Sequence, residues 1–91
     1  MFFVRCEVHP GVGAVDASVA VRDTRDVRTF LQVDRNLLTE RRGQAYLPVG
    51  LVHQDKERGV ALIEFPVEAD SGAHRLWVPA GSLLDANGVP A

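Results

Sequence analysis

The chain has 91 residues, of which 46% are hydrophobic and 24% are charged, and its formal net charge is -2. These values are those of one small globular domain, because a chain of this length buries a single hydrophobic core. The longest stretches without a charged residue, such as residues 45–54, are far shorter than the roughly 18 to 20 apolar residues of a membrane-spanning helix. The composition therefore excludes a helical membrane crossing and a second domain.

The N-terminal residues and the single cysteine indicate the cellular compartment of the protein. Arg5 and Glu7 lie where a signal peptide would have an uninterrupted apolar core, so we expect a cytoplasmic protein. Cys6 is the only cysteine, which excludes an intrachain disulfide and a zinc site built from several cysteines.

The first third of the chain alternates apolar and polar residues with a period of two, the pattern of half-buried strands. We expect strands over residues 2–9, 14–22 and 27–33, connected by turns at 10–13 and 23–26. Val4, Cys6 and Val8 share one face of the first strand, and Leu31 and Val33 share one face of the third.

The period changes at Asp34, a residue type that caps helices. Leu37, Leu38 and Arg41 follow at helical spacing and Gly43 is a suitable terminator, so about two helical turns are expected here.

The second half repeats this organisation. Residues 46–54 predict a strand in which Pro48 and Gly50 indicate an edge or a bend. After a charged turn at 55–59, the nearly continuous apolar residues 60–65 predict a central strand covered on both faces. A loop over 66–73, a last strand over 74–78 and a short helix after Pro79, through 82–84, complete the chain.

Each half thus reads strand, turn, strand, turn, strand, short helix. At a shift of 45 positions Leu31 matches Leu76 and Gly43 matches Gly88, and at 44 the pair at 8–9 matches the pair at 52–53. Two interpretations are open: half-repeats over 1–44 and 45–91, or chance matches between common residue types.

Six short strands predict a mainly β fold, either a small barrel or a strongly curled antiparallel sheet with one or two short helical turns, because such a sheet must close or pair its edges. The apolar strand at 61–66, the loop with Gly72 and the segment 75–84 resemble the closing half of an SH3-like small β-barrel. The resemblance covers about a quarter of the chain and concerns the fold alone, so it implies no functional residue.

Three aromatic side chains are expected on the strand faces that a half-solvated sheet leaves polar. They are Trp77 beside Arg75, Phe30 beside Arg28, and Phe3. Under one interpretation the short helices or the barrel interior cover them. Under the other they form an apolar patch for a protein partner or a second copy of the chain, since Trp and Arg are frequent interface anchors.

Catalytic and metal-binding patterns are weak. Cys6 and His9 are expected on opposite strand faces, and Asp70, Ser71 and His74 share one polar loop without any recognised nucleophile motif. We therefore expect no enzyme activity, no metal and no cofactor.

A nucleic-acid-binding small barrel is the alternative function. Arginines 22, 25 and 28 surround one turn, arginines 35, 41 and 42 lie on the expected helix after Asp34, and Phe30 is close by. Acidic residues interleaved with these arginines reduce the positive field. The sequence therefore favours a non-enzymatic binding module that contacts protein and self-associates.

Overall fold

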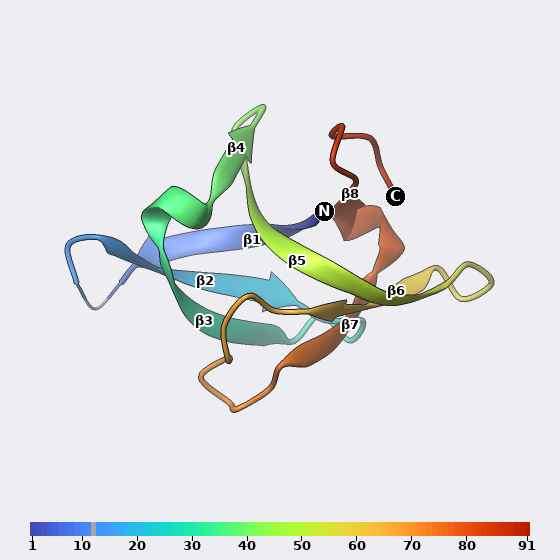
Figure 1. The fold of residues 1–91 in the computed structure, drawn as a ribbon. Coiled ribbons are helices and arrows are strands. Elements are labelled where there is room, and N and C mark those ends of the chain that lie inside the picture. The colour runs from blue at the N-terminus through green and yellow to red at the C-terminus, as the bar shows by residue number, and fades with distance from the viewer. Residues whose placement is uncertain (12) are drawn as a thin grey trace.

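A computed structural model describes residues 1–11 and 13–91 of the chain (Figure 1). Over these residues it contains eight strands and two 3₁₀ turns: β1 (Phe2–Pro10), β2 (Asp16–Arg22), β3 (Arg28–Asp34), η1 (Arg35–Leu37), β4 (Thr39–Arg41), β5 (Gln44–Asp55), β6 (Val60–Glu64), β7 (Arg75–Pro79), η2 (Ala80–Ser82) and β8 (Leu83–Leu84). All strand pairs are antiparallel, and the sheet curls into a half-barrel. The predicted mainly β fold with a strongly curled antiparallel sheet is confirmed.

The main path through the sheet is β3-β2-β1-β5-β6-β7, with β4 added beside β5 and β8 added beside β1. Each of the two outermost strands, β3 and β7, accepts a backbone hydrogen bond from a turn or loop at the other end of the sheet path. The Thr24 N–H, in the turn after β2, donates to the Trp77 carbonyl of β7 at 3.1 Å, and the Asp70 N–H, in the loop after β6, donates to the Phe30 carbonyl of β3 at 2.8 Å. These bonds draw the ends of the curled sheet toward each other.

The inner face of the curl holds the hydrophobic core. Its buried residues are Val4, Cys6, Ala17, Val19, Val21, Leu31, Val33, Leu47, Val49, Ala61, Ile63, Phe65, Ala69, Val78 and Leu83. The alternation predicted for the first three strands is therefore confirmed along the stretches that face the core, including that of the outermost strand β3. Val8 and Val27 share the apolar pattern but are exposed, because they lie at an outer strand end and in a turn.

The predicted helix after Asp34 is wrong in length. The Asp34 carboxylate caps as expected, accepting the Asn36 N–H at 2.8 Å, but only the single turn η1 follows. Leu38 returns to extended backbone and β4 then pairs with β5. Arg42 and Gly43 both have positive φ, so this glycine serves a two-residue hairpin and not a helix end.

The predicted helix over 82–84 is also wrong in its second part. Leu83 and Leu84 form β8 beside β1, because the fully buried Leu83 side chain completes the core. Each 3₁₀ turn spans three residues, and the described part of the chain contains no helix that is long and apolar enough to cross a membrane.

The features of β5 and β6 only partly match their predictions. Pro48 lies between the stretch of β5 that pairs with β4 and the stretch that pairs with β6, and the register shifts between Leu51 and His53, so the bend is confirmed. β6 lies between two strands, but only its inner face, with Ala61 and Ile63, is buried. The expectation that it is covered on both faces is wrong, because no layer formed by the described residues 1–11 and 13–91 buries the outer face of β6.

The two halves of the chain share one order of elements: three strands, a 3₁₀ turn and a short strand. His9 pairs with Ser18, and 44 positions later His53 pairs with Leu62. The last strand of each half pairs with the first strand of the other half: β4 pairs with β5, and β8 pairs with β1. That this correspondence arose from two half-repeats stays a prediction.

The predicted turn at 10–13 includes Val12, which lies outside the described residues.

Candidate functional site

Trp77 lies on the outer face of β7, opposite Leu62 of β6, and is 41% exposed. The His53 ring meets the indole edge-on, with centroids 6.1 Å apart and planes at 83°. Two shallow cavities of about 270 and 250 Å³ flank the indole, and Thr24, in the turn after β2, borders both. The exposed indole is therefore supported from one side by imidazole and is open to solvent.

Arg75 projects from the same face as Trp77, and its Nε lies 3.2 Å from Glu64 Oε1. We define the Trp77 surface by these side chains and the neighbouring charged turns: Asp23, Arg25, His53, Asp55, Arg58, Leu62, Arg75 and Trp77. The predicted association of Trp77 with Arg75 holds because residues two apart on a strand share one face.

Phe30 and Arg28 lie together on β3, at the other end of the sheet path. The Phe30 side chain is 37% exposed and its ring centroid lies 6.4 Å from that of His9. Phe3 is half-buried on β1, opposite Pro48 of β5 and Leu84 of β8. The five residues predicted for binding thus occupy three separate places on the outer face.

Neither 3₁₀ turn contains a buried residue, so these turns do not form a layer over the outer face. Trp77 and Phe30 remain partly exposed for this reason. The interpretation in which short helices cover the aromatic residues is therefore wrong.

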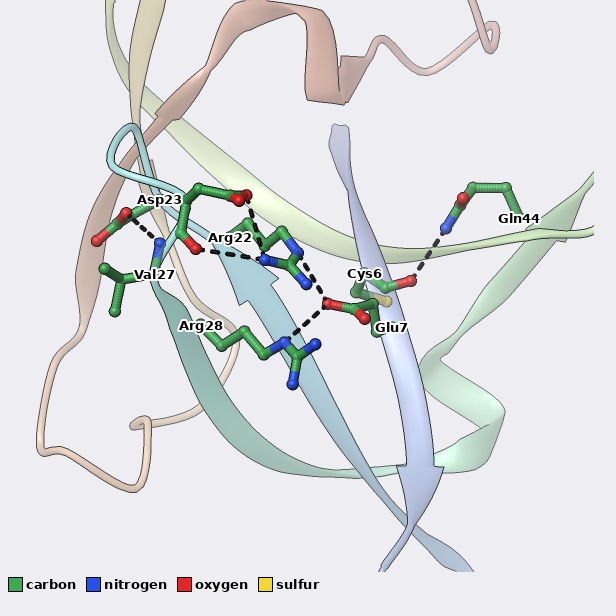
Figure 2. A network of polar contacts seen from close by, with 8 residues as sticks. Cys6, Glu7, Arg22, Asp23, Val27, Arg28 and Gln44 are labelled. Carbon is green, nitrogen blue, oxygen red and sulfur yellow. Dashed lines mark hydrogen bonds and ion pairs between the residues drawn. The ribbon is translucent and has the colours of Figure 1, made fainter.

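Two of the three arginines around the turn between β2 and β3, Arg22 and Arg28, are engaged with carboxylates (Figure 2). Glu7 Oε1 lies 3.1 Å from Arg22 Nε and 3.4 Å from Arg28 Nε, and Asp26 Oδ1 lies 3.2 Å from Arg22 Nη1. Asp23 Oδ1 accepts the backbone N–H groups of Arg25 and Val27 at 2.8 and 2.9 Å. Positive charge near Phe30 is largely neutralised by these contacts.

Three other arginines come together around a cavity of about 530 Å³. Arg5 lies on β1 opposite Tyr46 of β5, while Arg41 and Arg42 come from the end of β4 and its hairpin. We call this space the arginine cleft. Sequence reasoning placed Arg41 and Arg42 on a helix and missed Arg5, because only the pairing of β1 with β5 brings them to one side.

The candidate catalytic groups do not assemble. Burial raises the pKa of the Cys6 thiol to about 11, and its side chain is 3% exposed, so a reactive thiolate is disfavoured. In the polar loop, Ser71 Oγ accepts the Ala73 N–H at 3.4 Å and Asp70 Oδ2 accepts from Gln32 Nε2 at 3.3 Å. These contacts organise the loop itself.

Among the described residues, no group of three or more His, Cys, Asp or Glu side chains is placed to hold a metal ion. Comparison of the chain with protein-family models, with curated proteins and with solved structures found no match.

Proposed function

We propose that the chain is a non-enzymatic binding domain that associates with a second copy of itself through the Trp77 surface. The observation that carries this proposal is the exposed indole on an outer strand, flanked by hollows and by charged residues. Tryptophan anchors at interfaces act by filling a hollow and excluding water. In a dimer the partly exposed indole of one copy can serve as the anchor, and a shallow cavity beside the indole of the other copy can receive it.

A second copy is the partner that the charges favour. The Trp77 surface contains Asp23 and Asp55 together with Arg25, Arg58 and Arg75, so both signs are present on one face. In a two-fold dimer the same face meets itself, and a face that carries both signs can then pair arginines with aspartates across the axis.

Side chains rather than an added strand would make this contact. The backbone at Trp77 already accepts the Thr24 N–H, and the opposite end of the sheet is engaged at Phe30 by Asp70. Continuous strand addition needs a free row of backbone groups, which these bonds interrupt.

Sedimentation velocity across micromolar to millimolar concentrations tests the proposal. The unchanged chain is expected to show a concentration-dependent dimer, and Trp77→Ala is expected to weaken it about 30-fold or more, the size of an interface hot spot. Phe30→Ala is the matched control, because Phe30 is exposed to a similar degree (37% against 41%) but lines neither of the two cavities beside Trp77. A monomer at every concentration, or equal weakening by both variants, refutes self-association through Trp77.

The nucleic-acid alternative has less support. Of the six arginines expected to form its basic surface with Phe30, at positions 22, 25, 28, 35, 41 and 42, Glu7 and Asp26 neutralise Arg22 and Arg28. Arg41 and Arg42 line a cavity to which Phe30 does not belong. Titration of labelled single-stranded DNA and RNA at two salt concentrations would detect such binding by its salt dependence. The likeness of the segment 61–84 to SH3-like barrels likewise remains a proposal, consistent with a small curled β fold.

A further inference from the structure

The arginine cleft lies over the outer face of β1 and β5, between the β4–β5 hairpin and the C-terminal residues 85–90. In Figure 1 β4 and the C-terminal segment stand on the same side of these two strands. The guanidinium-bearing residues Arg5, Arg41 and Arg42 line the cleft together with Tyr46, and Val89 and Pro90 supply an apolar wall. Its volume of about 530 Å³ is within the range of sites for small organic ligands.

No carboxylate belongs to the described lining of the cleft, and the neighbouring carboxylates are committed elsewhere. Glu7, two positions from Arg5, is held by Arg22 and Arg28. Asp85 Oδ1 accepts the N–H groups of Asn87 and Val89 at 2.8 and 3.0 Å. Three cations therefore share the cleft without a carboxylate among its lining residues.

Glu40 is the remaining nearby carboxylate, and it lies between Thr39 and Arg41 on β4. Successive side chains of a strand point to opposite faces, so Glu40 is directed away from the face that carries Arg41. It does not line the cleft.

Backbone features lie beside two of the arginines. The Arg41 guanidinium lies directly against Gly88, where an added Cβ would overlap it, so this glycine makes room for the cation. Arg42 has a φ of 53° in the hairpin turn, a conformation that residues with a Cβ rarely adopt. The absence of a side chain at Gly88 thus leaves the space that the Arg41 guanidinium occupies, and the turn sets the backbone from which Arg42 extends.

We propose that the arginine cleft binds the phosphate group of a small phosphate monoester, with the organic part against Tyr46 and the apolar wall. Guanidinium groups match phosphate oxygens in charge and geometry, and a dianion relieves the repulsion among three cations better than a single carboxylate does. Arg22, Arg28, Arg58 and Arg75 each lie within 4 Å of a carboxylate. These four arginines therefore do not extend the unpaired positive charge beyond the cleft. A positive patch limited to the cleft favours a small anion over a polynucleotide.

Titration of the full chain with phenyl phosphate, followed by NMR, tests the proposal. We expect saturable binding with a Kd of about 1 mM or tighter, weaker binding of inorganic phosphate and none of benzyl alcohol. Arg41→Gln and Arg42→Gln are each expected to weaken phenyl phosphate binding about tenfold or more, because each removes one charged donor. Arg35→Gln is the control, since it removes an exposed arginine that lies outside both the cleft and the Trp77 surface.

Gly88→Ala gives a second, independent variant. It is expected to displace Arg41 and weaken binding, whereas Gly59→Ala, also at positive φ but with nothing within 4 Å of the added Cβ, is expected to leave binding unchanged. Three results would overturn the proposal: no binding of phenyl phosphate up to about 20 mM, equal weakening by cleft and control variants, or tighter binding of a single-stranded oligonucleotide that is lost in Arg41→Gln.

Discussion

The buried Cys6 thiol makes the stability of the fold depend on pH in the alkaline range. Burial raises its pKa from the 9.0 of an exposed cysteine to about 11. The folded state therefore binds the thiol proton more tightly than the unfolded state, and this contribution is fully present below pH 9 and is lost as the pH rises toward 11. For these two pKa values the loss is about 1 kcal/mol at pH 10 and about 2 kcal/mol at pH 11.

Urea unfolding at pH 8, 10 and 11 under reducing conditions measures this loss. Cys6→Ala is the reference, because it removes the thiol and retains every other titrating group. The free-energy advantage of the unchanged chain over Cys6→Ala is expected to shrink by the amounts above as the pH rises. If the two proteins lose stability in parallel from pH 8 to pH 11, the argument from burial is wrong.

Four further substitutions, at three positions, test the core and the turns. Leu47→Ala removes a fully buried side chain and is expected to lower the free energy of unfolding by about 3 kcal/mol, while Leu37→Ala, at a 38% exposed position, is expected to cost less than about 1 kcal/mol. Urea unfolding measures both, and similar losses would contradict the assigned core. Asp23→Ala removes the acceptor of two backbone N–H groups and is expected to cost about 1 to 2 kcal/mol in thermal unfolding, with most of that loss avoided in Asp23→Asn. Equal losses in the two Asp23 variants would mean that the hydrogen bonds are not responsible.

Much of the fold was predictable because strand alternation is a local property. Val4 and Cys6 face the core as the period of two requires, and Trp77 shares the outer face with Arg75 for the same reason. The helical prediction failed after η1 because spacing of leucines alone does not distinguish a helix from a turn followed by a strand. Leu83 in β8 is buried by its pairing with β1, which nothing in its neighbours indicates.

The two candidate sites also differ in how much of each could be predicted from the sequence. The Trp77 surface combines β7, a strand predicted from the sequence, with the turn after β2. This turn lies beside Trp77 through the hydrogen bond from the Thr24 N–H, which the sequence does not predict. The arginine cleft depends entirely on long-range pairing, because Arg5 and Arg41 are far apart in the chain and meet only where β4 and β1 flank β5.

The sequence by itself determined that this chain is a small, mainly β domain, with its apolar residues alternating along short strands, because those properties follow from composition and local periodicity. Only the tertiary structure decided which strands are neighbours, which aromatic side chains stay exposed and which arginines lack a carboxylate. These features depend on pairings between residues distant in sequence, such as β1 with β5 and β8 with β1, whose register is set by core packing in the folded state.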